Sequence, residues 1–393
     1  MQVTFVSNYI NHHQIPLSNE LYAKLGDKYH FVQTEPMEEE RVKMGWGSSV
    51  NELPYLVCYY EKPDFCKQLI LESDVVIFGG VEDESYIEER LEKRLFTIRC
   101  SERIYKEGQW KMISPRGLVK KYHDHIRYRK NDVYMLCSGG YVADDFRLIG
   151  AYPNKMLKWG YFVEKYNYDL KELFEEKNSK DEPVILWVGR MIGLKHPEYA
   201  VYMAQELKKQ NRKFKLRFIG DGEKKEEMVA LVKELDLIDC VEFEGFMEPK
   251  KVRKEMERAD ILLMTSNRIE GWGAVVNEAM NAGCVVVASH ISGAAPFLIK
   301  HEINGLIFKG GSYVSLTDEV IKIIDNTSYR MEMGKAAYKT VDKLWNSEIA
   351  AKRLLEFCNS KNVDAYEEGP CSKAIPIREW KMYRNLVKGK GKK

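Results

Sequence analysis

The chain has 393 residues, of which 45% are apolar and 31% are charged. This length and this balance predict a globular protein of two or three domains, with two the simplest reading, and exclude a disordered one. The formal charge is +2, from 61 basic and 59 acidic residues, so the whole molecule lacks the charge signature of a polyanion-binding protein.

The cysteines and the N-terminus both bear on the compartment in which the protein works. The eight cysteines form no C-x-x-C pair, which argues against zinc sites and favours a reducing environment. The chain begins directly with a strand-like run, so we expect no signal peptide. No apolar run approaches the roughly 18 residues of a membrane span. The expected location is therefore cytoplasmic.

Short apolar runs alternate with amphipathic stretches along the chain. In the first part we expect strands at residues 3–7, 74–80, 95–99 and 133–137, with helices at 14–25 and 63–71. In the second part we expect strands at 184–188, 215–220, 241–243, 261–265 and 285–289, with helices at 197–209, 224–235, 250–258 and 272–282. This alternation predicts an α/β fold with parallel, doubly wound sheets.

The domain boundary is predicted in the charged stretch 164–183, which ends in a proline before a strong strand. The expected parts are an N-terminal Rossmann-like domain at residues 1–165, a linker at 166–182, a second Rossmann-like domain at 183–360, and a crossing helix with a basic tail at 361–393. We expect the two domains to face a cleft, because ligands of such sheets bind beyond the carboxyl ends of the strands.

The turn after the predicted strand 184–188 carries the first candidate site residues. Gly189 and Arg190 follow the strand, and Lys195 comes shortly before a helix. Two cations beside free helix N–H groups suit a pyrophosphate. A plain turn with surface cations explains the pattern equally well. The turn is not G-x-G-x-x-G, so the fingerprint of a nicotinamide dinucleotide site is absent here.

The most informative segment is TSNRIEGWGAVVNEAMNA, residues 265–282. It places Glu270 in a loop and Glu278 about two turns into a helix that is expected to begin near Trp272, at ~3.6 residues per turn. A carboxylate on an apolar helix face needs partners, because its burial costs several kcal/mol otherwise. Two ribose hydroxyls would serve, since a carboxylate accepts from both.

Five pieces of the second half carry a resemblance to a known family: VGRMIGLKHP, FIGDGE, VEFEGF, ADILLMTS and EGWGAVVNEAMNAGCVVVAS. In this order they resemble the motifs of retaining glycosyltransferases of the GT-B fold, specifically the large GT4 family, also called glycosyl transferases group 1. The last piece is similar to the E-x7-E signature of that family. The resemblance covers roughly residues 183–358.

The resemblance implies a role for each of these residues. Arg190 and Lys195 would clamp the diphosphate of a nucleotide-sugar donor, Glu278 would hold the ribose, and Glu270 would contact sugar hydroxyls. Backbone N–H groups would hold the sugar and phosphates, from Gly271, Trp272, Gly273, Ala274 and Val275. The sugar would be transferred with retention of configuration. Cations and helix ends stabilise the leaving diphosphate, so no metal and no cofactor is expected.

The sequence also lacks a D-x-D motif that would argue for a metal. The adjacent pair Asp144 and Asp145 is interpreted as solvated helix surface.

The first domain departs from the family pattern, because the loop after its first strand lacks the glycine pair of many members. Asn11 and His13 in this loop are candidates for the acceptor side, with His13 slightly preferred. The alternative is that Asn11 caps the helix and the histidines are solvated. Ser101 and Glu102 follow a later strand and are further candidates. A buried structural pair of Glu102 with Arg103 is at least as good an explanation.

Two basic segments stand out from an otherwise acidic chain. Residues 116–130 carry six cations and one acid, interleaved with Tyr122 and Tyr128. Such a stretch suits contact with an anionic membrane surface, and equally a solvated helix face. Nucleic acid would need a broader basic surface and is not expected. In the tail, the spacing of Trp380, Tyr383 and Leu386 predicts a helix that packs on the body, and the last lysines would add weak attraction to lipid.

Together these features predict a cytoplasmic, metal-independent, retaining glycosyltransferase that acts on a glycan or a lipid-linked glycan, with peripheral membrane contact as one option. The alternatives are a phosphorylase-like or hydrolytic use of the same site and a non-catalytic protein that binds nucleotide sugars. Neither the donor sugar and its base, nor the acceptor, nor the oligomeric state can be predicted from the sequence.

Overall fold

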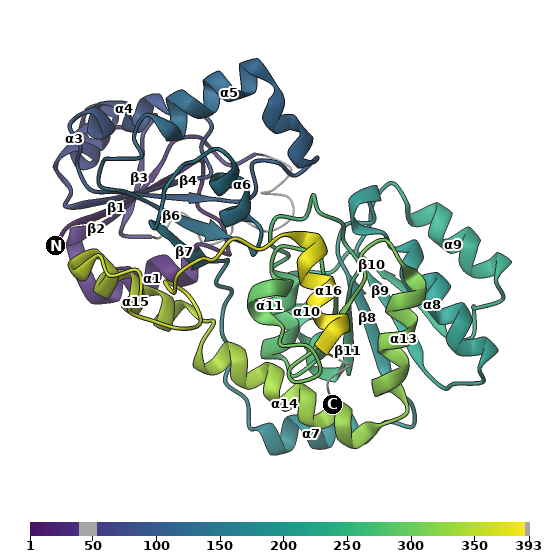
Figure 1. The fold of residues 1–393 in the computed structure, drawn as a ribbon. Helices are drawn as coiled ribbons and strands as arrows, with labels where there is room; N and C mark the ends of the chain where they lie inside the picture. Colours follow the sequence, from purple (N-terminus) through teal and green to yellow (C-terminus); the bar gives the residue numbers. More distant parts are fainter. Residues whose placement is uncertain (39–52, 390–393) are drawn as a thin grey trace. The chain divides into compact units, whose positions relative to one another are not determined.

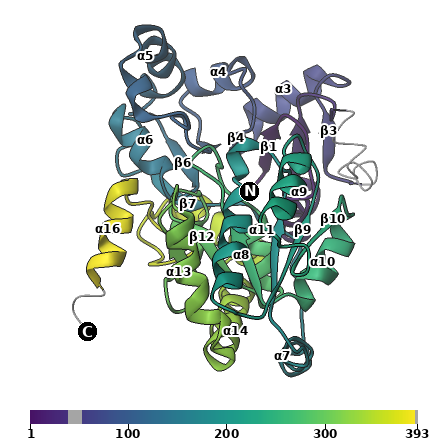
Figure 2. The same ribbon diagram turned by 90° about the vertical axis from the view of Figure 1, so that its right-hand side faces the viewer.

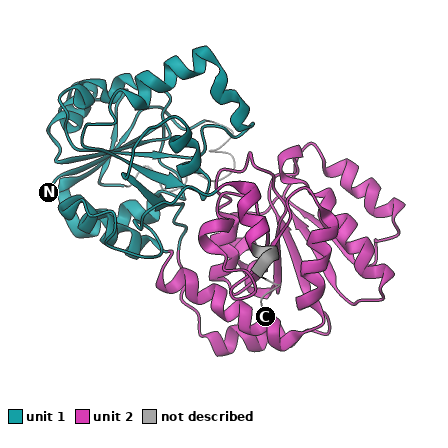
Figure 3. Cartoon of the chain, viewed as in Figure 1, with its two compact units in different colours: residues 1–164, 346–377 teal, residues 165–345, 378–393 magenta. Residues whose placement is uncertain are grey.

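A computed structural model describes residues 1–38 and 53–389, with the side chains of 386–389 left out. Figure 1 shows the ribbon with its helices and strands labelled, and Figure 2 shows it from the side. The chain divides into two compact units, which Figure 3 colours separately. Unit 1 comprises residues 1–164 and 346–377, and unit 2 comprises residues 165–345 and 378–393.

Unit 1 is built on a parallel sheet of seven described strands in the order β3-β2-β1-β4-β5-β6-β7. The strands are β1 (Val3–Ser7), β2 (Tyr29–Gln33), β3 (Leu56–Cys58), β4 (Val75–Gly79), β5 (Thr97–Ser101), β6 (Val133–Ser138) and β7 (Met156–Trp159). Its helices are α1 (Ile15–Leu25), α3 (Pro63–Glu72), α4 (Ser85–Glu92), α5 (Pro115–Lys121), α6 (Val142–Leu148) and α15 (Ser347–Ser360), with short helical turns η1 (Gly26–Lys28), η3 (Gln109–Ile113) and η4 (Tyr122–Ile126).

Unit 2 holds a second parallel sheet, of six strands in the order β10-β9-β8-β11-β12-β13 within the described residues. The strands are β8 (Val184–Val188), β9 (Lys215–Ile219), β10 (Val241–Gly245), β11 (Ile261–Met264), β12 (Val285–Ser289) and β13 (Leu306–Phe308). The helices are α7 (Leu170–Asn178), α8 (Glu198–Lys209), α9 (Lys225–Glu234), α10 (Pro249–Arg258), α11 (Val275–Asn281), α12 (Ala295–Leu298), α13 (Tyr313–Ile324), α14 (Thr327–Lys343) and α16 (Glu379–Gly389), with the turn η5 (Gly193–Lys195).

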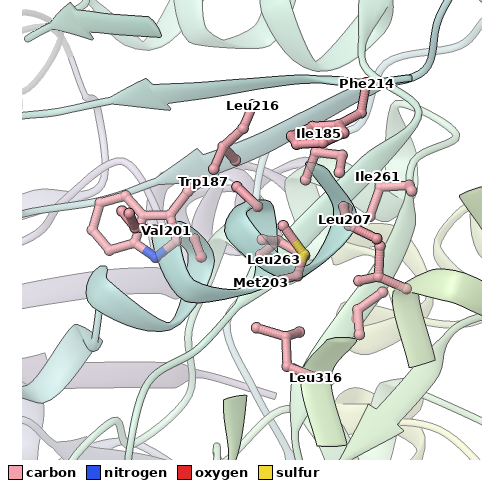
Figure 4. Packing of buried hydrophobic residues seen from close by; sticks show 14 of the residues in the cluster. Ile185, Trp187, Val201, Met203, Leu207, Phe214, Leu216, Ile261, Leu263 and Leu316 are labelled. Atoms are coloured by element: carbon pink, nitrogen blue, oxygen red, sulfur yellow. The ribbon is translucent and has the colours of Figure 1, made fainter. Parts of the chain in front are cut away.

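The core of unit 2 forms where the apolar face of α8 meets the sheet. Val201, Met203 and Leu207 on this helix pack against Trp187 of β8 and Leu263 of β11, as Figure 4 shows. All five side chains are buried. Each such side chain contributes roughly 1.5–3 kcal/mol when it leaves water. The predicted strands 184–188 and 285–289 coincide with β8 and β12, because continuous apolar runs mark strands that are covered on both faces.

The strand order also determines where a site can form in unit 2. The chain winds outward from β8 through β9 to β10, and then returns to place β11 on the other side of β8. This reversal lies between β8 and β11, and ligands of doubly wound sheets bind beyond the carboxyl ends of the strands at such a point. The turns after β8 and β11 are therefore neighbours, although about 75 residues separate Lys195 from Glu270 along the chain.

The predicted fold class of two Rossmann-like, doubly wound domains is confirmed for each unit. The strands β2, β3, β7 and β13 were not predicted from the sequence. Three of them, β3, β7 and β13, lie at a sheet edge. Strands β3 and β13 have only three residues, so their apolar runs are too short to stand out.

The expected domain boundaries need two corrections. The stretch 166–182 is not a linker, because α7 lies in it and packs on unit 2 through Phe174 and Lys177. The Lys177 ammonium donates to the carbonyl oxygen of Met256 at 3.0 Å. The region expected at 183–360 also ends too late, because α15 belongs to unit 1, where Phe357 packs on Phe96. The helix predicted from the spacing of Trp380 and Tyr383 is present as α16, and it belongs to unit 2.

Candidate active site

The turn after β8 is held in place by backbone contacts with the neighbouring turn. Gly220 has a φ of 131°, and a Cβ atom there would overlap the carbonyl oxygen of Gly189. The amide of Met191 donates to the carbonyl oxygen of Asp221 at 2.8 Å. The turns after β8 and β9 thus touch backbone to backbone, which only glycine permits at position 220.

Lys195 is held by the turn after β11. The Thr265 hydroxyl donates to the carbonyl oxygen of Lys195 at 2.5 Å, and the Asn267 amide donates to that of Leu194 at 2.9 Å. The Lys195 ammonium forms an ion pair with the Glu270 carboxylate. Arg190 lies exposed at the same strand end, and among the described residues no side chain pairs with it. Two of the four predicted catalytic residues, Lys195 and Glu270, are therefore in direct contact.

The glycines around Glu270 are required by close packing. Gly273 has a φ of 92°, and a Cβ atom there would overlap Met264 and lie 3.6 Å from Cγ of Glu270. A Cβ atom on Gly293 would overlap the carbonyl oxygen of Gly271. The Glu270 side chain therefore folds back along Gly273, within a loop that leaves no room for larger residues.

Helix α11 begins at Val275, three residues later than expected, because the positive φ of Gly273 interrupts the helical path. Glu278 consequently lies in the first turn of the helix, not two turns into it. Within the part of the chain that the structure describes, no group accepts from the backbone N–H groups of Gly273, Ala274 or Val275. Amides at a helix start that lack an internal partner are available to an external acceptor.

The Glu278 carboxyl is the most perturbed acid at this edge. Burial raises its pKa to about 7, against the opposing charge of Arg253. Arg253 does not reach the carboxyl group by a hydrogen bond. It donates instead to the backbone carbonyl oxygen of Glu278 at 2.6 Å and to the side chain of Asn281. No donor from residues 1–38 or 53–389 is seen at the Glu278 carboxylate, which leaves its acceptor sites available to a ligand.

Arg253 and Asn281 are positioning residues that the sequence did not single out. Arg253 lies over the ring of Tyr166 at 4.4 Å, and Asn281 exchanges hydrogen bonds with the backbone of Tyr166. Together they tie α11 to the start of unit 2 and so orient Glu278. A lone arginine on an exposed-looking helix such as α10 gives no sequence signal of this role, because its partners come from two other segments.

Trp272 can contact a ligand only through its backbone. Its side chain is buried, and its indole N–H donates to Asn277 at 2.8 Å. The ring lies against Trp345 and Phe297 in the core. An indole enclosed in this way stabilises the loop and presents no side-chain surface to a ligand.

The candidate residues of unit 1 gather around an unpredicted residue, Tyr161. The His13 ring stacks on that of Tyr161 at 5.8 Å between centroids, and the Tyr161 hydroxyl donates to Glu102 at 2.5 Å. Ser101 donates to the backbone of Glu102 at 2.7 Å, and the side chain of Asn11 accepts from the His13 amide at 3.0 Å. All four candidates thus belong to one connected cluster. Tyr161 was missed because it follows β7, a strand that the sequence did not reveal.

Burial corrects one alternative and the interpretation of the paired aspartates. The pKa of His13 is held well below its usual value by burial and by the neighbouring His12, so His13 is not a solvated histidine. Arg103 forms its ion pair with Asp145 at 3.1 Å and not with Glu102, which pairs with Lys106. Asp145 is completely buried, so the expectation of a solvated helix surface is wrong. A short helix such as α6 has too few residues to show which face is covered.

One group of side chains in unit 2 has the composition of a metal site. Ligand atoms of His301, Glu302 and Glu319 lie within 4.8 Å of one another. The ammonium of Lys322 pairs with Glu302 at 3.1 Å and with Glu319 at 2.5 Å. Nδ1 of His301 accepts from the Ile307 amide at 3.0 Å, which puts the proton of the neutral ring on the nitrogen that faces the acids. This arrangement is satisfied as an ion-pair network.

Part of this chain is similar in sequence to known proteins. Residues 169–340 match the family model described as glycosyl transferases group 1. The chain is 28% identical over 204 residues to the amylovoran biosynthesis glycosyltransferase AmsK of Erwinia amylovora, covering 51% of this chain and 49% of AmsK. It is 33% identical over 144 residues to a 2-deoxystreptamine glucosyltransferase of Streptomyces kanamyceticus, covering 37% of each chain. The chain thus spans about half the length, or less, of these relatives.

Solved structures match the fold over nearly the whole chain. The structure of HepE from Anabaena in complex with UDP has a TM-score of 0.68 at 14% identity, covering 92% of this chain and 100% of that one. The apo form of the lipopolysaccharide outer core galactosyltransferase WaaB has a TM-score of 0.67 at 16% identity, with the same coverage. The predicted resemblance to GT-B glycosyltransferases is confirmed: residues 169–340 match the family model of glycosyl transferases group 1, and the chain has the fold of GT-B glycosyltransferases.

Proposed function

We propose that this protein is a glycosyltransferase that moves a sugar from a nucleotide-sugar donor to a glycan or lipid-linked glycan acceptor. The observation that carries the proposal is the Glu278 carboxyl at the switch point of unit 2. It is buried enough to raise its pKa to about 7 and receives no hydrogen bond from the described residues. A protein leaves a carboxylate in this state where a ligand supplies the donors.

The neighbouring groups match the parts of such a donor. Arg190 and Lys195 are the cations for the diphosphate, and the amides of Gly273 and Ala274 add donors beside them. Glu278 accepts from the ribose hydroxyls. When the diphosphate binds, Lys195 transfers its contact from Glu270 to the phosphates, which releases Glu270 to the sugar hydroxyls. We propose transfer with retention of configuration.

The departing diphosphate gains negative charge as the glycosidic bond breaks. Fixed cations and oriented amides stabilise that charge without a metal ion, which is the chemistry we propose here. Two structural neighbours support a uridine nucleotide as the donor to test first, since they are HepE in complex with UDP and with UDP-glucose.

Relatives of this chain support the class of acceptor. A poly(ribitol-phosphate) N-acetylglucosaminyltransferase and a phosphatidylinositol monomannoside mannosyltransferase are among the proteins similar to half of this chain. We propose an acceptor of the same broad kind, a polymer or lipid-linked glycan presented on the cytoplasmic side of a membrane.

The test measures the thermal stabilisation of the wild type and of Glu278→Gln by UDP, GDP, ADP and CMP. A ligand at about 100 times its Kd adds ~2.7 kcal/mol of stability. We expect one nucleotide to stabilise the wild type and to lose most of its effect on the variant. The matched control is Lys213→Ala, an exposed lysine of unit 2, which should respond as the wild type does.

Turnover with the matching nucleotide sugar then separates the alternatives. Release of free sugar without an acceptor would replace transfer by hydrolysis, and release of a sugar phosphate in phosphate buffer would indicate a phosphorylase. Binding without turnover on any acceptor would indicate a binding protein. Stabilisation of wild type and Glu278→Gln alike would show that Glu278 does not hold the nucleotide.

A further inference from the structure

Large apolar side chains are concentrated at the surface of one segment of unit 1. Trp110 is 69% exposed, Ile113 73%, Val119 60% and Tyr122 53%, and Leu118 between them is also exposed. They lie on η3, α5 and the start of η4, which Figures 1 and 2 both show at the margin of unit 1. We call these five residues, with the cations between them, the α5 surface. Contiguous exposed apolar groups of this kind mark interaction sites.

The α5 surface is attached to unit 1 by buried contacts at the end of the segment that carries it. Helix α5 has no buried residue. The turn that follows it is fixed by buried His125, whose ring is hydrogen-bonded to the Tyr152 hydroxyl at 2.8 Å, and by Arg99, which donates to the carbonyl oxygen of Asp124. The segment is therefore attached through residues 124–125, while its apolar side chains stay in water.

The spacing gathers the apolar groups in two rows. Trp110 and Ile113 are three residues apart in a 3₁₀ turn, where side chains at this spacing eclipse one another. Leu118 and Tyr122 are four residues apart in the helical path that follows, where that spacing also shares a face. No described residue of the body covers either row, since all four side chains remain exposed.

Cations are interleaved with these rows. Arg116 and Lys120 are exposed on α5, and Arg129 and Lys130 are exposed just beyond it. The acids nearby are already paired, Asp124 with Lys120 at 3.0 Å and Glu107 with Lys111. Residues 116–130 carry a net charge of +5. Exposed tryptophan, leucine and valine among lysines and arginines is the composition of a segment that lies in the interface of an anionic bilayer.

We propose that the α5 surface docks this protein on an anionic lipid bilayer, with Trp110, Ile113, Leu118 and Val119 in the headgroup region and the cations against acidic lipid. The contact is peripheral, since no helix in residues 1–38 and 53–389 is long and apolar enough to cross a bilayer. Docking requires neither a nucleotide nor a sugar. It stands apart from the proposed transfer reaction, to which it would bring a lipid-linked acceptor.

Co-sedimentation of the full-length protein with vesicles tests the proposal. We compare phosphatidylcholine vesicles with vesicles that contain phosphatidylglycerol, and expect binding to the second kind only. Each lysine or arginine near an anionic surface strengthens binding about fivefold, so Arg116→Ser with Lys120→Ser should weaken it about 25-fold. Trp110→Ser with Val119→Ser should weaken it at least about tenfold, because the inserted apolar area is lost.

Two controls isolate the α5 surface. Ile238→Ser with Ile303→Ser removes two equally exposed apolar residues of unit 2, at 65% and 62%, and should bind as the wild type does. The lysines at 390, 392 and 393 lie outside the described residues, and their replacement by glutamine tests the predicted lipid attraction of the tail. Loss of binding in the tail variant alone would overturn the proposal. So would equal binding to both kinds of vesicle, or a dimer in solution that the tryptophan–valine variant abolishes.

Discussion

The polar residues at the carboxyl edges of the two sheets differ in whether they have side-chain partners. In unit 1, His13, Tyr161 and Glu102 contact one another, and Arg103 is neutralised by buried Asp145. In unit 2, Glu278 and Arg190 have no such partner among the described residues. The same type of sheet thus carries candidate residues that contact one another in unit 1, whereas two of the four candidate catalytic residues in unit 2 lack a side-chain partner among the described residues.

This difference distinguishes residues that stabilise the fold from residues that are available to bind a ligand. A charged group without a partner lowers the free energy of unfolding. Such groups are therefore typical of sites where a ligand supplies the missing contacts. Paired charge stabilises the chain without any ligand. Substitutions in unit 1 should therefore act mainly on stability, and those at the unit 2 edge mainly on binding and turnover.

The largest effect is expected for Asp145→Ala in unit 1. Its removal takes the Asp145 carboxylate away from the buried guanidinium of Arg103, and also removes the acceptor of the Tyr105 amide at 3.2 Å. Breaking a buried pair in this way costs about 3–5 kcal/mol of unfolding free energy. Urea denaturation measures it, with exposed Asp181→Ala as the matched control. A loss no greater than that of the control would mean that this edge is not held by the pair.

The next effect is on catalysis by the proposed site. Lys195→Ala removes a cation from the diphosphate position, and loss of one such group lowers kcat/KM by about 10²–10³, or ~2.7–4 kcal/mol. The unfolding free energy should change by less than about 1 kcal/mol, because the Lys195–Glu270 pair is partly exposed. Steady-state kinetics measure the first and urea denaturation the second. Turnover within threefold of the Lys213→Ala control would remove Lys195 from the site.

Glu278→Gln should raise stability at neutral and higher pH. The folded pKa of about 7 lies above the ordinary value of 4.5, so the native state holds a proton between these values that the unfolded chain has lost. Wild-type stability therefore falls as the pH rises from about 4.5 to 7, by about 1–3 kcal/mol. The glutamine variant lacks this titration. Urea denaturation at pH 5, 6 and 8 should show its advantage growing with pH, whereas a constant difference would contradict the raised pKa.

The smallest effect should come from Tyr161→Phe, which keeps the ring against His13 and removes the hydrogen bond to Glu102. A single bond of this kind stabilises by about 1 kcal/mol. Donor-nucleotide binding should not change, because the donor residues belong to unit 2. A change in the KM for the acceptor would place this cluster beside the acceptor, as its sequence position predicted. A change in nucleotide affinity would instead break the separation between the two edges.

The sequence by itself determined the class of fold, and it supplied the candidate residues of the proposed site in unit 2. Buried parallel strands read as continuous apolar runs, so β8 and β12 could be bounded to the residue. Glycines and charged residues that follow such strands made Lys195, Glu270 and Glu278 candidates, because ligands bind at the carboxyl edge of a doubly wound sheet. These are local properties of the chain, and they can be recognised without knowing which distant residues each segment contacts.

The tertiary structure alone decided which distant groups meet. The unit to which α7, α15 and α16 belong depends on which core covers the apolar face of each helix. An amphipathic pattern does not reveal this, because it is the same for either core. The burial of Asp145 depends on Arg103, 42 residues away, and the orientation of Glu278 depends on Arg253, 25 residues away. Periodicity reports which face of an element is covered, but not by what, and pairings across such separations are made only when the chain is folded.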